Sequence, residues 1–226
     1  VDDGQFGRRI SSQDLDLGSR TAIAGVKDLV WYPAEVNTSI RPGWFYHASE
    51  DDKVRSLDEL LNVYFGSVGG NATFLLNIPP DKRGLIHEND VARLKELGDY
   101  LKSLFQSDLV KEAAITSTGF RLGDGTGAYW RTPDGIEEME LSLDLGEAQT
   151  FNTVVLGEAI VKGQRVESFT LSALVDDAWQ EIYAGTVIGY KKIGRFAPVT
   201  ARHVRLSITK SRYFPTLKNF ELYLSP

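Results

Sequence analysis

Residues 29–47 read LVWYPAEVNTSIRPGWFYH, and this stretch decides how the rest of the chain is interpreted. The continuous apolar run Leu29–Tyr32 predicts a buried strand that a proline ends. Residues 33–43 predict a connecting loop, and Trp44–Tyr46 predicts a second short strand after a Pro-Gly turn. Two apolar runs that each meet a polar or aromatic cluster predict two edges of one pocket.

Composition narrows the classes of partner. The 226 residues carry a net charge of −6, which argues against nucleic acid because phosphate binding relies on clustered Lys and Arg. No apolar run approaches the roughly 20 residues of a membrane helix, so we expect no membrane span. The absence of cysteine excludes disulfides, thiol catalysis and Cys-ligated metals. An acidic chain with 11% aromatic residues suits a neutral polar ligand.

The first half of the chain alternates strands and helices, which predicts βα units and a parallel sheet. A Ser-x-x-Glu capping box at Ser56 begins one helix, and Gly69-Gly70-Asn71 ends it. Thr73–Ile78 predicts a buried strand, and a second helix is expected from about residue 88 to 105. Its expected apolar stripe is Val91, Leu94, Leu97, Leu101 and Leu104, and the residues expected to face water are Asp90, Arg93, Lys95, Glu96 and Lys102.

The second half has little helical periodicity. Short alternating or β-branched runs, punctuated every ten to twelve residues by Gly, Asp or Pro, predict a β-sandwich. We therefore divide the chain into residues 1–106 and 107–226, with a hinge near residues 106–114. The predicted strands are Glu138–Leu145, Thr150–Gly157, Ser168–Leu174, Trp179–Tyr183, Ala201–Ile208 and Leu217–Leu224.

The α/β half is too short to be a closed fold. About 110 residues hold two clear βα units, whereas a closed (β/α)8 barrel takes about 250 residues. Two or three parallel strands would leave an open edge and an uncovered apolar face. We therefore expect this chain to be the C-terminal piece of a longer protein that supplies the remaining strands.

Several residues beside the predicted strands could take part in chemistry. Glu35 follows the first apolar run, so it is a candidate acid, base or ligand clamp, with a solvated loop residue or a partner of Arg41 as the alternatives. Trp44 could stack on the apolar face of a sugar or pack in a core. For Asn77 we favour a hydrogen bond to a neighbouring loop, and Asp81 is interpreted as a turn residue.

No metal or cofactor motif is visible. The three histidines are far apart in sequence and lack metal-type spacing, so we predict no metal site. The chain also lacks a nucleophile elbow, a phosphate loop and a dinucleotide fingerprint, and we expect no cofactor. In the sandwich, the aromatic residues that could form a sugar platform are Trp130, Trp179, Tyr190 and Tyr213-Phe214, of which about half are expected to be core.

WYPAEVNTSIRPGWFYH, SVGGN and LLNIPPDKRGLI closely resemble the end of the catalytic domain of glycoside hydrolase family 29, the α-L-fucosidases. The resemblance covers about residues 15–105, and SIRPGWFYH resembles the branch that prefers α-1,3/1,4-linked fucose. Residues 115–226 resemble the discoidin-like β-sandwich that follows the barrel. The resemblance implies the C-terminal part of a (β/α)8-type barrel plus a β-sandwich.

The resemblance also implies a retaining mechanism with an Asp nucleophile and a Glu acid/base. The nucleophile motif is absent here, and the acid/base is expected upstream of residue 1 as well. Trp44 matches an aromatic residue near the fucose subsite, and Glu35 matches a site-facing carboxylate that is the replacement candidate for the acid/base. Arg41 belongs to the matched motif and is counted among the substrate-binding residues.

The function expected from these observations is removal of terminal α-linked L-fucose from glycans by a bacterial-type enzyme, secreted or periplasmic, although no signal peptide is visible. Its expected partners are a fucosylated oligosaccharide or glycoconjugate and the N-terminal remainder of the same enzyme. One alternative is a non-catalytic carbohydrate-binding protein that acts through the sandwich. Another is a sandwich with a purely structural interaction role.

Overall fold

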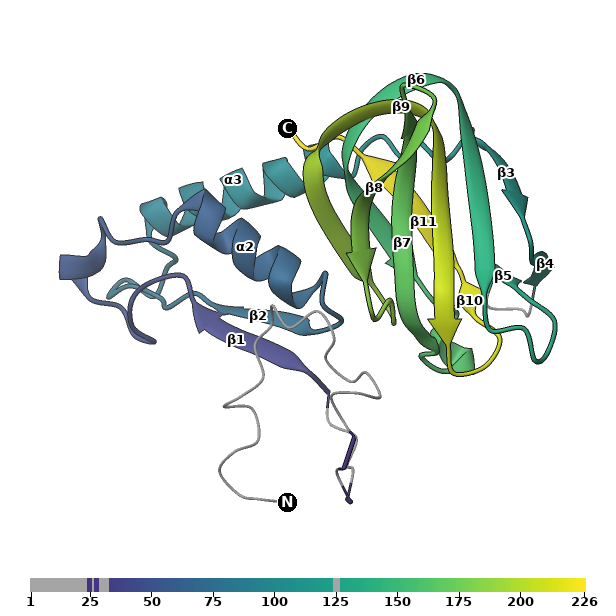
Figure 1. The fold of residues 1–226 in the computed structure, drawn as a ribbon. Coiled ribbons are helices and arrows are strands. Elements are labelled where there is room, and N and C mark those ends of the chain that lie inside the picture. The colour runs from purple at the N-terminus through teal and green to yellow at the C-terminus, as the bar shows by residue number, and fades with distance from the viewer. Residues whose placement is uncertain (1–23, 26, 29–32, 124–126) are drawn as a thin grey trace.

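The computed structural model describes residues 24–25, 27–28, 33–123 and 127–226. The predicted strand Leu29–Tyr32 lies outside the described residues, as does the loop predicted for residues 1–20. Figure 1 shows two parts side by side: helices α2 and α3 with strands β1 and β2 on one side, and a β-sandwich on the other.

The first part is built on two parallel strands, β1 (Glu35–Ser39) and β2 (Thr73–Asn77), which pair from Glu35 with Thr73 to Ser39 with Asn77. The strand expected at Trp44–Tyr46 is wrong, because these residues lie in a bent loop. The loop expected over residues 33–43 is also wrong, because β1 lies within it. β1 alternates exposed and half-buried positions in a largely polar sequence, a pattern that a search for apolar runs passes over.

The two predicted helices are confirmed as α2 (Leu57–Ser67) and α3 (Glu88–Leu104), with a short 3-10 turn, η1 (Ala48–Glu50), before them. The capping box is present, since Ser56 Oγ accepts from the Glu59 amide at 3.2 Å and the Ser56 amide donates to Glu59 at 2.8 Å. The buried face of α3 differs from the predicted stripe. Asp90 is fully buried rather than facing water, whereas Val91 is exposed.

The second part is a β-sandwich, as expected. Among the described residues, one sheet has the order β11-β6-β9-β7-β8 with β3 beside β6, and the other has the order β10-β5-β4. Two predicted strands merge into the long bent strand β6, and β3, β4 and β5 were not predicted. The bounds are β3 (Ala114–Ser117), β4 (Phe120–Gly123), β5 (Ala128–Arg131), β6 (Met139–Gly157), η2 (Ile160–Lys162), β7 (Val166–Val175), β8 (Ala178–Gly185), β9 (Lys192–Ser211), β10 (Thr216–Leu217) and β11 (Asn219–Tyr223).

The two parts share a hydrophobic cluster, because Val155, Ile193 and Tyr223 of the sandwich pack with buried residues of α2 and α3. The turn after α2 makes the closest approach. The Ile193 amide donates to the Gly69 carbonyl at 3.1 Å, and a Cβ on Gly69 would lie 2.9 Å from the Ile193 Cβ. The Gly-Gly-Asn segment therefore ends the helix, as predicted, and also docks the sandwich.

The sandwich consequently lies at the C-terminal ends of α2 and α3, and the arrowhead of β1 points away from it (Figure 1). The carboxyl ends of β1 and β2 form the opposite edge of the α/β part. No helix among the described residues is long and apolar enough to cross a membrane.

Candidate functional site

The carboxyl ends of β1 and β2 bring together two loops that are far apart in sequence. Because Ser39 pairs with Asn77, the segment after β1 and the segment after β2 leave the sheet at the same edge. Asn77 joins them, since its Nδ2 donates to Ser39 Oγ at 3.1 Å and to the Trp44 carbonyl at 3.0 Å. The expectation that Asn77 bonds a neighbouring loop is confirmed.

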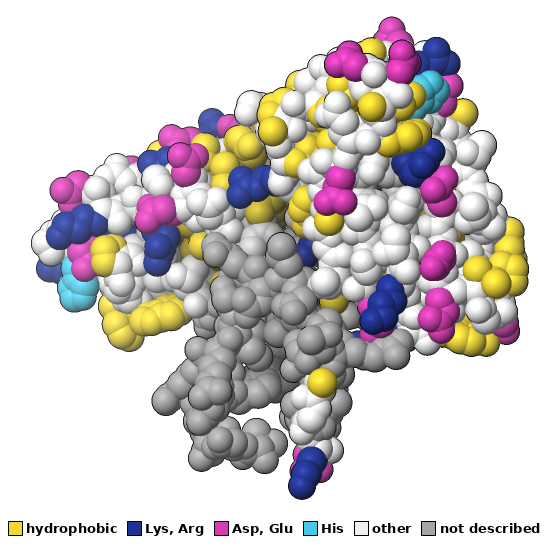
Figure 2. Space-filling model, viewed as in Figure 1, with side chains coloured by type: hydrophobic (Ala, Val, Ile, Leu, Met, Phe, Trp, Pro, Cys, Tyr) yellow, Lys and Arg dark blue, Asp and Glu magenta, His cyan; other side chains and the backbone are white. Residues whose placement is uncertain are grey.

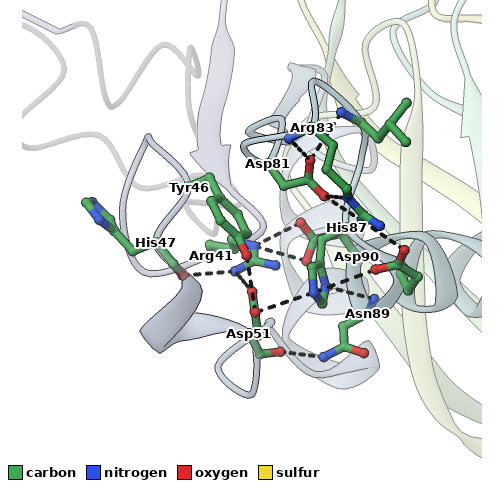
Figure 3. Close-up of polar contacts among 11 residues, drawn as sticks. Arg41, Tyr46, His47, Asp51, Asp81, Arg83, His87, Asn89 and Asp90 are labelled. Carbon is green, nitrogen blue, oxygen red and sulfur yellow. Dashed lines mark hydrogen bonds and ion pairs between the residues drawn. The ribbon is translucent and has the colours of Figure 1, made fainter.

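Arg41 is the centre of a buried polar network that holds this loop (Figure 3). Its guanidinium has no exposed surface, and Nε donates to both carboxylate oxygens of Asp90, at 3.1 and 2.9 Å. Nη1 donates to Asp51 Oδ1 at 2.9 Å and to the His47 carbonyl at 3.5 Å. Arg41 thus joins the end of β1 to the first turn of α3 and to both ends of the segment His47–Asp51.

This position corrects two expectations about Arg41. It does not pair with Glu35, and its side chain has no surface on which a sugar could bind directly. Burial lowers the pKa of Arg41, but the hydrogen bonds to Asp90 and Asp51 outweigh that cost and hold the pKa above its ordinary value. The guanidinium is therefore charged at every accessible pH, and it acts as a fixed anchor for the loop.

A second layer of contacts completes the network. Tyr46 donates its hydroxyl to Asp51 Oδ2 at 3.2 Å and stacks on His87, with ring centroids 6.1 Å apart. His87 Nε2 lies 3.4 Å from the same Asp51 oxygen, and Asn89 Nδ2 donates to the Asp51 carbonyl at 2.7 Å. Burial raises the pKa of Asp51, but the Arg41 bond, the His87 charge and the Tyr46 hydroxyl outweigh it and lower that pKa overall.

Trp44 and Phe45 project from the loop that this network fixes. Their side chains are 51% and 78% exposed, although the backbone that carries them is tied to Asn77 on one side and is flanked by Arg41 and Tyr46. Figure 2 shows hydrophobic side chains exposed at this end of the α/β part, away from the sandwich. Two exposed aromatic rings on a fixed backbone provide an apolar surface on which a sugar ring or another flat apolar face can pack.

A shallow pocket of about 310 Å³ lies beside the network, lined by Tyr46, Asp81, Arg83 and His87 among others. Asp81 accepts from the amides of Arg83 at 2.7 Å and Leu85 at 3.3 Å, so its interpretation as a turn residue is confirmed. The hydrogen bond from the Arg83 side chain is the largest influence on Asp81 and lowers its pKa. The pocket walls therefore carry fixed charges of both signs.

Comparison with known proteins adds a family to this geometry. Residues 18–104 match the family model described as Alpha-L-fucosidase, and residues 103–220 match the F5/8 type C domain. Alpha-L-fucosidase 1 of Arabidopsis thaliana is 35% identical over 209 residues, which cover 86% of this chain and 41% of that protein. A structure of a Ruminococcus gnavus GH29 fucosidase in complex with fucose is 29% identical with a TM-score of 0.81, covering 88% of this chain and 43% of that one.

The chain belongs to glycoside hydrolase family 29, the α-L-fucosidases. The structure of a family 29 member from a rumen bacterium is a further match, 33% identical with a TM-score of 0.72, covering 87% of this chain and 33% of that one. The chain spans about 40% of the length of the curated plant relatives that it matches.

Within this family member, Glu35 does not lie at the edge where we expected it. It is the first residue of β1, at the end of the strand opposite to Arg41 and Trp44, and its side chain is exposed. The prediction that Glu35 follows a buried strand rests on Leu29–Tyr32, which lies outside the described residues; in the described chain Glu35 begins β1. The structure brings Arg41 and Trp44 together and leaves Glu35 apart from both.

Sequence reasoning missed most of the network. Asp51 was given no role, His87 was counted among histidines without metal-type spacing, and Asp90 was expected to face water, because local periodicity does not signal a contact across 49 residues. The signals available in the sequence were a carboxylate, Asp90, in the first turn of α3 and an arginine, Arg41, in the SIRPGWFYH motif. In the described part of the chain, no cluster of three His, Cys, Asp or Glu side chains could hold a metal ion.

Proposed function

We propose that the complete protein carrying this chain is a retaining α-L-fucosidase, and that this chain supplies one wall of its sugar site. The observation that carries the proposal is the aromatic loop at the carboxyl ends of β1 and β2, which exposes Trp44 and Phe45 on an anchored backbone. Apolar sugar faces pack on such rings, and the relatives of this chain are α-L-fucosidases.

The open sheet supports completion by further strands. In the described chain β1 pairs only with β2, and Leu75 of β2 is exposed. A two-stranded parallel sheet with free edges is an unstable arrangement by itself. We propose that additional strands and helices complete a (β/α)8 barrel, in which the carboxyl ends of the strands form the active-site face. Arg41 and Trp44 then lie on that face, and Glu35 lies on the opposite one.

The mechanism we propose is double displacement. A carboxylic acid protonates the glycosidic oxygen as a carboxylate attacks the anomeric carbon, which breaks the C1–O bond to the leaving group and forms a fucosyl-enzyme ester. Water then attacks the same carbon, gives its proton to the first carboxylate and releases fucose with its original anomeric configuration. Both carboxyl groups, about 5–5.5 Å apart in retaining enzymes, are expected outside these 226 residues.

The finer features of this enzyme are proposals of the same kind. The preference for α-1,3/1,4-linked fucose rests on the SIRPGWFYH motif, and comparing hydrolysis of α-1,2-, α-1,3- and α-1,4-linked fucosides tests it. A bacterial source and a secreted or periplasmic location stay predictions, because the matched relatives include plant and bacterial proteins.

The experiment is to incubate the complete protein with an aryl α-L-fucoside and follow the products by proton NMR. We expect the α-anomer of L-fucose to appear first and to mutarotate afterwards. The 226-residue chain at the same concentration should release no fucose. Initial release of the β-anomer would contradict the retaining mechanism, and turnover by the 226-residue chain would contradict the proposed division of the site.

A further inference from the structure

The linker between the two parts of the chain forms one wall of a groove. The groove has a volume of about 530 Å³, and its other walls come from β3, β4, β5 and β10 of the sandwich. Strands β3, β4 and β5 lie on the side of the sandwich that faces away from helices α2 and α3 (Figure 1). Neither the proposed hydrolysis nor the loop of Trp44 involves this groove.

The floor of the groove is apolar. Leu141 has no exposed surface and Leu217 is 1% exposed, and both belong to the main core of the sandwich. Half-buried apolar side chains that pack against this core complete the floor, namely Ala113, Ile115, Trp130 and Phe220. A continuous apolar floor of this kind provides a binding surface for the hydrocarbon part of a small molecule.

The linker wall is fixed by hydrogen bonds. Asp108 Oδ1 accepts from the amides of Val110 at 3.0 Å and Leu222 at 3.1 Å, and the Leu109 amide donates to the Leu222 carbonyl at 3.0 Å. These bonds tie the linker to β11, so the wall is formed before any ligand arrives. Asp108 is the one carboxylate among the described lining residues, and burial raises its pKa in spite of the two amide donors.

The rim of the groove is positively charged. Lys111 and Arg121 are exposed, and neither forms an ion pair with another residue of the described chain. The Arg121 guanidinium lies over the ring of Trp130, its cross-strand partner, at 5.9 Å from the ring centroid. Lys218 also lines the groove. Positive charge therefore exceeds negative charge here, although the whole chain carries a net charge of −6, and such a local excess attracts an anion.

The floor and the rim together restrict the ligand. A cation would be repelled by the rim, and a small inorganic anion would leave the apolar floor in water. A neutral hydrocarbon would leave the cations without a partner. An apolar body that carries one carboxylate satisfies both surfaces, because its hydrocarbon covers the floor and its carboxylate accepts charge-assisted hydrogen bonds from Arg121 and Lys111.

We propose that this groove binds a small apolar carboxylate of the medium-chain fatty acid type. Its hydrocarbon lies on the floor beside Trp130 and Ile115, and its carboxylate lies between Lys111 and Arg121. The bound molecule contacts the linker and β4 at once and so joins them. The proposal does not depend on fucoside hydrolysis by the complete protein.

The test compares three ligands with the same eight-carbon chain but different charge: octanoate, 1-octanol and octyltrimethylammonium. Each is titrated into the 226-residue chain, with calorimetry for affinity and ¹⁵N NMR for location. We expect saturable binding of octanoate with Kd on the order of 1 mM or tighter, and binding of the other two at least about tenfold weaker. Octanoate should shift the amide signals of the linker and β4 and leave those of β8 unchanged.

Lys111→Glu and Arg121→Glu should each weaken octanoate binding at least about tenfold, which corresponds to about 1.4 kcal/mol, and leave the melting temperature unchanged because both side chains are exposed. Lys95→Glu is the matched control, since it makes the same charge change at an exposed position of α3 that does not line the groove, and its Kd should equal that of the parent chain.

If a glutamate variant lowers the melting temperature, Lys111→Gln replaces it, because this change removes the charge without adding an opposite one, and it should still weaken octanoate binding at least about threefold. Three outcomes would overturn the proposal: no saturable binding of octanoate, equal Kd for octanoate and 1-octanol, or equal Kd for the parent chain and the groove variants.

Discussion

The buried ion pair between Arg41 and Asp90 allows a quantitative prediction. Asp90→Ala removes the carboxylate that faces Arg41 Nε at 2.9 and 3.1 Å, and both side chains have no exposed surface. Breaking a fully buried pair typically costs about 3–5 kcal/mol, because the remaining charge has lost both water and its partner. Asp51 still contacts Nη1, so we expect the lower end, about 3 kcal/mol.

The assay is urea unfolding of the 226-residue chain, combined with hydrogen exchange of the Arg41–Asp51 segment measured by mass spectrometry. Asp90→Ala should lower the unfolding free energy by about 3 kcal/mol and speed exchange in this segment, while exchange in β7 of the sandwich stays unchanged. Glu96→Ala is the control on the same helix. It removes an exposed partner of Arg93, and exposed pairs contribute about 0–1 kcal/mol.

The double variant Arg41→Met/Asp90→Leu separates charge burial from packing. Because it removes both charges and keeps apolar volume, it should be less destabilised than the sum of the two single variants, by about 2 kcal/mol. An Asp90→Ala cost no larger than that of Glu96→Ala would refute the reasoning, since the pair would then not anchor the loop. Additive single effects would show that the two side chains act independently.

Three further predictions concern other parts of the chain. Glu35→Gln should leave kcat/KM of the complete protein for an aryl α-L-fucoside within about twofold of the parent value, because Glu35 lies at the end of β1 opposite to Trp44. A hundredfold loss that azide restores would instead make Glu35 the acid/base. Gly98→Ala, in a helix position with open space, should raise the unfolding free energy by about 0.5–1 kcal/mol. Gly69→Ala should lower it, because the new Cβ would lie 2.4 Å from the Phe65 carbonyl oxygen and 2.9 Å from the Ile193 Cβ of the sandwich; equal effects of the two variants in urea unfolding would contradict this close packing. The Arg202 hydrogen bonds lower the pKa of Asp144 below its ordinary 3.8, so the stability from this pair is present above that pH and is lost as pH falls below it. The difference in melting temperature between the parent chain and Asp144→Asn should therefore shrink between pH 5 and pH 3, and a constant difference would argue against the linkage.

The sequence predicted the elements that local pattern determines. The Ser-x-x-Glu box marked the start of α2, and the apolar run TFLLN marked β2, because each signal is contained in a few neighbouring residues. β1 was not predicted, because its polar, alternating sequence gives a weaker strand signal than the aromatic run that follows it. The long strand β6 was divided into two in the prediction, and only the second half of β9 was predicted, because turn-like residues inside these strands mark bends and register shifts rather than chain reversals.

The candidate site was only partly predictable for a related reason. The motif around Trp44 is local and could be recognised, and the structure places Trp44 at the carboxyl edge of the sheet. The role of Arg41 depends on Asp90, which lies 49 residues away, and on Asp51. Only the fold brings these side chains together, so a residue expected to bind substrate proves to be a buried anchor.

The most direct test of the account is kcat/KM for an aryl α-L-fucoside, measured on the complete protein and on its Trp44→Ala variant. The account predicts that the complete protein releases L-fucose and that Trp44→Ala lowers kcat/KM at least tenfold, about 1.4 kcal/mol, without lowering the melting temperature. Unchanged kcat/KM in Trp44→Ala, or no fucose release by the complete protein, would contradict the claim that this loop forms a wall of a fucose site.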